Sequence, residues 1–192
     1  MPTDMKRKMI AVINNAVDGS SKRTGIWVLP DWLSHPNSDD VITLDVPGYF
    51  QANTFSCGVT AGLMVLHTFH PSRSKDRFYR RVDPCPEDGT STAQLVRALR
   101  QSRIGVGVRY DLSWDRVNRN VSDGYPIITV VKTGDEDVEH WVVIYGVGKK
   151  PNRVFIAANG CLWITRREYR WKELCSLWPP EGKGFGLVCW GK

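Results

Sequence analysis

The sequence contains no long apolar run and no recognisable export signal. No stretch reaches the roughly 18 apolar residues of a membrane-spanning helix, so we expect no membrane segment. The basic first residues, MPTDMKRKMI, are followed by a short apolar part that the pair Asn14-Asn15 interrupts. Because no small-residue cleavage site follows a proper apolar region, the sequence predicts no signal peptide.

Cysteine is scarce and does not occur in metal-binding or disulfide patterns. The 5 cysteines are an odd number, without a CxxC pair or a close histidine. This spacing argues against a zinc site and favours reduced thiols, which are typical of the cytoplasm. We therefore predict a cytoplasmic protein that uses no metal and no other cofactor.

Charge of one sign is not concentrated anywhere in the chain. The formal net charge is +6, but the basic pairs, such as Arg80-Arg81 and Lys149-Lys150, are spread along the sequence. A basic surface attracts nucleic acid or acidic proteins, whereas dispersed pairs without interleaved aromatic residues are more typical of a solvated face. Nucleic acid is thus not an expected partner.

The 192 residues, 42% hydrophobic and 24% charged, fit one globular domain with an ordinary core. We assign the domain to residues 41–192 and treat residues 1–40 as an N-terminal extension or strap. No motif in residues 1–40 shows which of these two interpretations is correct.

Helix signals dominate the first half of the domain and strand signals the second. Capping patterns predict helices after Ser91 and Ser113. A further capping pattern, Thr-x-x-Glu at 165–168, predicts a helix toward Leu174. β-Branched runs predict strands at 41–46, 104–110, 126–132, 139–146, 153–158 and 184–190, and the three central ones are expected to be antiparallel neighbours. This order predicts the α+β class.

The stretch FQANTFSCGVTAGLMVLHTF, residues 50–69, holds the strongest candidate for a catalytic residue. Cys57 begins a segment that is too apolar for a surface helix and is expected to be buried. Unpaired N–H groups and the positive end of the helix dipole favour the thiolate, which is the nucleophile. Gln51 lies six positions earlier (57 − 51), close enough to return its amide as an oxyanion donor. Cysteine is often a core residue, but the position beside Gly58 at a helix start favours the catalytic interpretation.

Of the 4 histidines, His140 is the best candidate for the base that Cys57 would need. It lies at the start of a predicted strand, where a rigid backbone holds an imidazole at hydrogen-bond distance. His67, late in the apolar helix, is more typical of a packing residue. Asn159 follows the next predicted strand, beside His140, and is a candidate to orient the ring, although Asn-Gly is also an ordinary turn signal. Trp141 is either a wall of the site or an aromatic core residue.

Taken together, these motifs resemble the papain-like superfamily of cysteine peptidases. Within it, they are most similar to the bacteriocin-processing (double-glycine leader) peptidases and their stand-alone relatives. The similar pieces span residues 43–175 and include Gln51 with FSCG, the segment DGTSTAQLVRALRQSRIGV, GYPIITV, EHWVVIYGVG and the strand ending in AANG. The resemblance implies a papain-like fold, in which a central helix starting at the catalytic cysteine packs on an antiparallel sheet, and a bacterial protein.

The resemblance also implies roles for individual residues. Cys57 would be the nucleophile and His140 the general base and then acid. Asn159 would orient His140, and Gln51 with the backbone N–H of Cys57 would form the oxyanion hole. Relatives often have Asp-Pro where this chain has Asn159-Gly160, which bears on the third assignment more than on the others.

The leading hypothesis is a thiol hydrolase that cleaves a peptide or isopeptide bond in a protein or peptide substrate. The resemblance implies a preference for a small-residue, Gly-rich cleavage site. The same residues would serve an acyltransferase or transglutaminase-like enzyme, in which an amine resolves the thioester. A catalytically inactive member that binds peptides is a third possibility, which the joint presence of Gln51, Cys57 and His140 disfavours.

Overall fold

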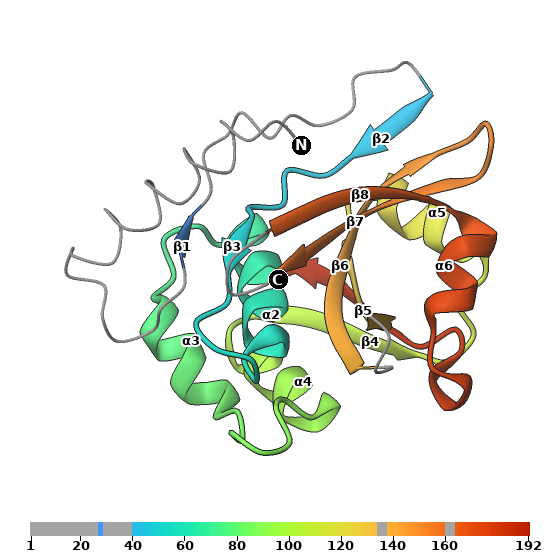
Figure 1. Cartoon of the computed structure of the whole chain (residues 1–192). Helices are drawn as coiled ribbons and strands as arrows, with labels where there is room; N and C mark the ends of the chain where they lie inside the picture. Colours follow the sequence, from blue (N-terminus) through green and yellow to red (C-terminus); the bar gives the residue numbers. More distant parts are fainter. Residues whose placement is uncertain (1–26, 29–39, 134–137, 160–163) are drawn as a thin grey trace, which may run out of the picture.

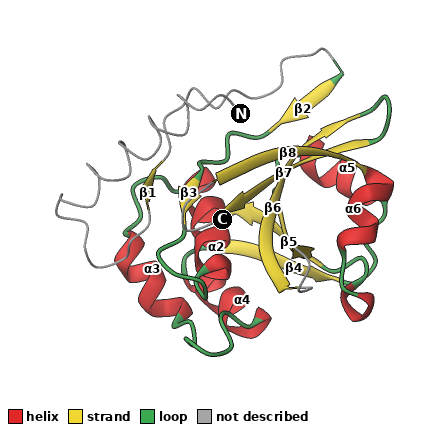
Figure 2. Ribbon diagram, in the orientation of Figure 1, coloured by secondary structure: helices red, strands yellow, loops and turns green. Residues whose placement is uncertain are grey.

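An antiparallel sheet with helices on both faces forms the body of the protein (Figure 1). The computed structural model describes residues 27–28, 40–133, 138–159 and 164–192. One face of the sheet carries the helices α2 (Cys57–Phe69), α3 (Lys75–Val82) and α4 (Thr92–Gln101), and the other carries α5 (Trp114–Ser122) and α6 (Trp171–Leu177), as Figure 2 shows. Within these ranges, no helix combines the length and apolar character needed to cross a bilayer.

Helix α2 is the central element because its sequence is apolar on every side. All of its residues from Cys57 to His67 are buried, as expected. Gly62 permits this crowding, since a Cβ there would lie 2.6 Å from Leu95 Cδ1 of α4 and 2.9 Å from Phe78 Cζ of α3. The helix ends directly before His70, which precedes a proline and therefore disfavours helical geometry.

The main sheet has the strand order β4-β9-β5-β6-β7-β8, and β2 also pairs with β6. All of its pairings are antiparallel. Its strands are β2 (Val41–Thr43), β4 (Ile104–Arg109), β5 (Ile127–Thr133), β6 (Val138–Gly148), β7 (Arg153–Asn159), β8 (Ile164–Arg170) and β9 (Gly186–Gly191). The predicted α+β class and the predicted antiparallel neighbours β5, β6 and β7 are confirmed, whereas β2 is shorter than expected.

Strand β6 divides the core into two layers because its side chains alternate between the faces of the sheet. Trp141, Val143 and Tyr145 pack in the cluster that includes α2. Val142 and Ile144 pack in the second cluster, together with residues of α5 and α6. A near-continuous apolar run in the sequence therefore corresponds to a strand that is covered on both faces.

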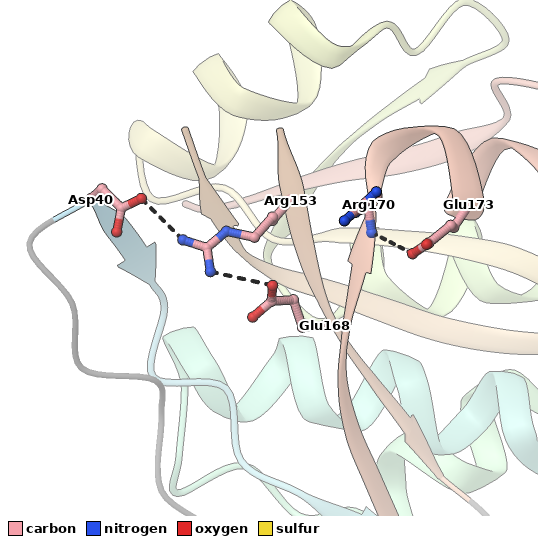
Figure 3. A network of polar contacts seen from close by, with 5 residues as sticks. All are labelled: Asp40, Arg153, Glu168, Arg170 and Glu173. Atoms are coloured by element: carbon pink, nitrogen blue, oxygen red, sulfur yellow. Dashed lines mark hydrogen bonds and ion pairs between the residues drawn. The ribbon is translucent and has the colours of Figure 1, made fainter. Parts of the chain in front are cut away.

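The predicted helix beginning at residue 165 is wrong. Residues 164–170 form strand β8, which pairs with β7 along its whole length. Pairing with the open edge of β7 satisfies the backbone groups of this segment, and that outweighs a local capping pattern. The helix α6 starts at Trp171 instead, where the backbone N–H of Arg170 donates to Glu173 Oε2 at 2.8 Å (Figure 3).

Arg153, the first residue of β7, links this strand to β8 and to the residue that precedes β2 (Figure 3). Its guanidinium group donates to Asp40 Oδ2 at 3.0 Å and to Glu168 Oε1 at 3.2 Å. Asp40 directly precedes β2, and Glu168 lies in β8. The side chain of Arg153 is only 18% exposed, so this pair of contacts is less screened by water than a typical surface ion pair.

The N-terminal region lies mostly outside the described residues. Its described part includes β1 (Trp27–Val28), which pairs with β3 (Tyr49–Phe50) in a separate two-stranded sheet. The interpretation of residues 1–40 as an extension or strap, and of 41–192 as the domain, stays a prediction.

Candidate active site

Cys57 is the first residue of α2, at a helix end that has no side-chain cap. The N-cap residue Ser56 makes no capping hydrogen bond, and its hydroxyl donates to the carbonyl of Asn53 at 3.2 Å instead. The first turn of α2 also carries no acidic residue. By contrast, a serine hydroxyl caps α3, α4 and α5, from Ser74, Ser91 and Ser113 respectively.

The missing cap of α2 affects the thiol of Cys57. The first N–H groups of a helix have no partner within the helix. Side-chain caps and acidic residues normally compensate them and the positive end of the dipole. Helix α2 has neither a side-chain cap nor an acidic residue in its first turn. The positive end of its dipole therefore acts on the side chain of Cys57, which is 9% exposed.

Gly58, which follows Cys57, lies against Trp141, which follows His140. A Cβ on Gly58 would lie 3.0 Å from Trp141 Cδ1 and 2.6 Å from Thr90 Cβ. The structure therefore brings the start of α2 close to the start of β6. His140 is the third residue of this strand.

His140 and Trp141 leave opposite faces of β6 because side chains alternate along a strand. It is Trp141 that packs on the α2 side. His140 pairs through its backbone with Val131 of β5 and is partly exposed. The elements that carry the predicted nucleophile and base are thus adjacent, and the direct bond between the two side chains stays a prediction.

Asn159 and Gln51 also lie on elements next to this point. Asn159 is the last residue of β7, one position beyond Ala158, whose backbone partner is Val142 of β6. Its side chain lies outside the described part of the structure. Gln51 is buried just after β3, and its Nε2 donates to the carbonyl of Asn53 at 2.9 Å. That bond uses one of the two N–H groups of the amide, and the predicted oxyanion role stays a prediction.

A cavity of about 560 Å³ opens beside Cys57. Its apolar walls come from Val130, Trp141, Phe185 and Tyr110. The Phe185 ring contacts both neighbouring aromatic rings, with centroid distances of 6.0 Å to Trp141 and 5.5 Å to Tyr110. The indole Nε1 of Trp141 donates to the carbonyl of Thr90 at 3.1 Å, which fixes the ring in the wall. Trp141 is therefore both a core residue and a wall of the site.

Sequence reasoning did not find Thr90, Tyr110 or Phe185. Each belongs to a different loop or strand end, and no short motif links any of them to Cys57 or His140. Only the pairing of β9 between β4 and β5 brings Phe185, just before β9, next to Trp141. No local pattern in the sequence predicts that strand order.

The other described cysteines lie in different surroundings. Cys189 is fully buried in β9, where burial raises the pKa of its thiol far above the ordinary value. Burial also raises the pKa of Cys175 in α6. Cys85 lies in a loop and donates to Glu87 Oε2 at 3.0 Å. Among the described residues, no group of three or more His, Cys, Asp or Glu side chains is arranged to hold a metal ion.

His67 is a packing residue, as its place late in the apolar helix predicts. Its Nε2 contacts the carbonyl of Arg73 at 2.9 Å, and its Nδ1 contacts the hydroxyl of Tyr49 at 2.5 Å. Since a carbonyl only accepts, the proton lies on Nε2, and Tyr49 donates to Nδ1. Burial lowers the pKa of His67 below its ordinary value of 6.5, which keeps the ring neutral.

Solved structures of peptidases share this fold. The peptidase domain of ComA from Streptococcus, a bifunctional ABC transporter involved in quorum sensing, has a TM-score of 0.58 and 18% identity over 74% of this chain and 96% of that chain. A C39-like peptidase from Bacillus anthracis has a TM-score of 0.59 and 15% identity, covering 80% of this chain and 99% of that chain. A double glycine motif protease from an AMS/PCAT transporter, solved with its leader peptide, has a TM-score of 0.58 and 16% identity over 78% and 94% of the two chains.

These similarities confirm the papain-like α+β fold that the sequence predicts. Among curated proteins, no sequence matches this one. The profile of the Peptidase_C39 like family matches residues 43–173, which include Gln51, Cys57, His140 and Asn159 and make up most of the 192 residues. The chain belongs to the Peptidase_C39 like family.

Proposed function

We propose that the protein is a cysteine peptidase that cleaves a peptide or isopeptide bond, with Cys57 as nucleophile and His140 as general base. The observation that carries this proposal is the position of Cys57. It lies at the uncapped N-terminus of a buried helix, lines the cavity and adjoins strand β6, whose third residue is His140. The family and its peptidase neighbours support the same class of function.

Acylation would begin when His140 accepts the thiol proton and Cys57 Sγ attacks the carbonyl carbon of the substrate. The carbonyl oxygen becomes an oxyanion, which the N–H of Cys57 and the amide of Gln51 would stabilise. His140 then gives its proton to the leaving nitrogen, the C–N bond breaks, and a thioester remains on Cys57. Asn159 would hold the imidazole in the tautomer that this transfer needs.

Deacylation would use a water molecule in place of the amine. His140 takes a proton from the water as its oxygen attacks the thioester carbon, and the C–S bond breaks. The carboxylic acid product leaves, and the thiol is restored. The substrate is proposed to be a peptide, since one structural neighbour was solved with its leader peptide, and small residues before the bond are the expected cleavage site.

Thiol labelling tests this proposal without a known substrate. Wild type, Cys57→Ala and His140→Ala would be treated with dilute iodoacetamide from about pH 4 to about pH 9, on both sides of the usual thiol pKa of about 8.5. Cys85→Ser serves as the background, because that thiol lies in a partly exposed loop. We expect Cys57 to react well below the usual pKa and to lose this reactivity in His140→Ala. If Cys57 reacts only after unfolding, the proposal is wrong.

A second measurement separates hydrolysis from acyl transfer. Peptides with Gly-Gly sequences would be incubated with the enzyme in the presence and absence of a small primary amine, and products identified by mass spectrometry. A free acid product in both cases indicates hydrolysis, and an amide product that predominates with the amine indicates transfer. Cys57→Ala must give neither product.

A further inference from the structure

The cavity beside Cys57 is acidic, although the protein as a whole is basic. Its lining includes the carboxylates of Glu87, Asp88, Glu139 and Glu181, and none of the described residues that line it is Lys or Arg. The chain contains 26 Lys and Arg against 20 Asp and Glu, with a net charge of +6. The sign of the charge at this cavity is thus opposite to that of the whole molecule.

The four carboxylates do not contribute equally. Lys132 lies directly opposite Glu139 in the β5–β6 register, and opposite charges in a cross-strand pair attract each other. The pKa of Glu87 is lowered by hydrogen bonds from the Cys85 thiol and from the backbone of Glu87 itself, so this carboxylate is ionised at neutral pH. The negative potential at the cavity is thus assigned mainly to Glu87, Asp88 and Glu181.

The interior of the cavity is apolar and aromatic. Val130, Trp141 and Phe185 form its wall, and Tyr110 and Val138 are 71% and 54% exposed at the surface that leads to it. Exposed apolar residues of this size beside a cavity are typical of a surface that binds a ligand. An apolar wall under an acidic rim matches a side chain that has an aliphatic stem and a cationic end.

The wall also contains a polar group that lacks a hydrogen bond. Thr90 lines the cavity, is 6% exposed, and its Oγ1 is buried with no hydrogen-bond partner among the described residues. A buried hydroxyl without a partner costs free energy. The backbone of Thr90 binds Trp141 and its side chain lies close to Gly58, so Thr90 holds the wall of the cavity against the start of α2.

We propose that this cavity is a specificity pocket for a lysine or arginine side chain close to the bond that Cys57 attacks. The stem of the side chain packs against Trp141 and Phe185, and its cation lies among Glu87, Asp88 and Glu181. This inference deepens the proposed function and rests on it, because the cavity gains its meaning from the adjacent nucleophile. It assigns a charge preference to the substrate, in addition to the small residues expected at the cleavage site.

The test measures binding rather than turnover, so that it does not depend on catalysis. Full-length Cys57→Ala protein is titrated with two probes, Nα-acetyl-lysine N-methylamide and Nα-acetyl-norleucine N-methylamide, which share a stem and differ in the cation. A third probe, Nα-acetyl-glutamate N-methylamide, carries the opposite charge. The NMR signal of the Trp141 indole N–H, assigned with Trp141→Phe, reports occupancy of the cavity.

We expect the lysine probe to bind about threefold to tenfold more tightly than the norleucine probe, since the ion pairs at the rim are partly exposed. The glutamate probe should bind most weakly. The double variant Asp88→Asn/Glu181→Gln should reduce the lysine-to-norleucine ratio toward one. Asp115→Asn, which removes a carboxylate from exposed α5 and does not line the cavity, is the control and should preserve the ratio.

Equal affinities for the lysine and norleucine probes would overturn the charge preference and leave a purely apolar pocket. No response of the Trp141 signal to any probe would overturn the pocket itself. Neither result bears on the thiol chemistry, because Cys57 is absent from the protein that is titrated. Conversely, an unreactive Cys57 in the labelling experiment would reject the peptidase proposal and leave the binding result intact.

Discussion

At the scale of single residues, the pair of Tyr49 and His67 lies at the far end of α2 from the nucleophile. Tyr49 is 4% exposed and His67 is 8% exposed. Burial raises the pKa of Tyr49 to about 12 and lowers the pKa of His67, and Lys75 lowers the latter further. Both side chains therefore remain uncharged in the folded protein over the physiological range.

This pair makes stability depend on pH. In the unfolded chain His67 titrates near 6.5, whereas in the folded protein it titrates at a lower pH. The unfolded state thus binds more protons below about pH 6.5, so the free energy of unfolding should fall as the pH falls from there, by at most about 1.4 kcal/mol per pH unit. The loss should stop once the pH is below the folded pKa. Urea unfolding of wild type and His67→Gln from neutral to acidic pH measures this, and an identical slope in the variant would contradict it.

Gly58 offers a second prediction at this scale. A Cβ at Gly58 would lie 2.6 Å from Thr90 Cβ and 3.0 Å from Trp141 Cδ1, so Gly58→Ala should displace the wall of the cavity or the start of α2. We expect a loss of unfolding free energy of about 1–3 kcal/mol and a marked decrease in Cys57 labelling at low pH. Gly107→Ala is the control, because its new Cβ would make an ordinary contact with Trp190 at 3.5 Å. Unchanged labelling in Gly58→Ala would show that the site tolerates this shift.

The sequence identified the chemically distinctive residues better than the residues that shape the site. Cys57 was recognisable because a polar turn, a glycine and an apolar helix surround it locally. Thr90 and Phe185 were not, since their role depends on which strands are neighbours. The alternation along β6, which places Trp141 on the α2 side, also requires the packing of the whole sheet.

At the scale of secondary-structure elements, α4 shows how strongly a local signal can determine a helix start. Ser91 accepts from the N–H of Gln94, and Gln94 Oε1 accepts from the N–H of Ser91, which completes the predicted capping box. Gln94 also donates to the carbonyl of Asp83 at 2.7 Å, at the C-terminus of α3. The cap therefore fixes the helix start and the contact between two helices at once.

Removal of this cap should destabilise the protein. Ser91→Ala is expected to lower the free energy of unfolding by about 1 kcal/mol, measured by urea unfolding. Ser122→Ala, on the exposed last turn of α5, is the control and should change it by less than about 0.5 kcal/mol. Equal losses of unfolding free energy in Ser91→Ala and Ser122→Ala would contradict this role of the cap.

Predictions of elements were correct where a local pattern agreed with the tertiary environment. The helices α4 and α5 start at their predicted serine caps. The segment 165–168 also carried a capping pattern, but a strand edge was available to it, and hydrogen bonds to β7 determined the outcome. Such competition between a local signal and a distant partner cannot be judged from the segment alone.

At the scale of the whole molecule, the sheet couples the two apolar clusters. Consecutive residues of β6 contribute to opposite clusters, so loss of the sheet would disrupt the packing of both. Leu63 lies in the cluster with α2 and Ile144 in the cluster with α5 and α6, and both are fully buried.

We therefore expect one cooperative unfolding transition. Leu63→Ala and Ile144→Ala should each lower the free energy of unfolding by about 2–5 kcal/mol. In each variant, the urea midpoints from far-UV circular dichroism and from tryptophan fluorescence should coincide. Separate midpoints in Ile144→Ala, with the α2 cluster persisting, would show that the two layers unfold independently.

The position of β9 has a consequence for biosynthesis. Residues 186–191 insert between β4 and β5, inside the sheet rather than at its edge. During translation, Cys57 and its helix emerge long before this strand, and a nascent chain that lacks β9 leaves the facing edges of β4 and β5 unpaired. Phe185, which directly precedes β9, also reaches the cavity only then. Cys57 is therefore synthesised early, but the wall of the cavity is completed only when β9 has emerged from the ribosome.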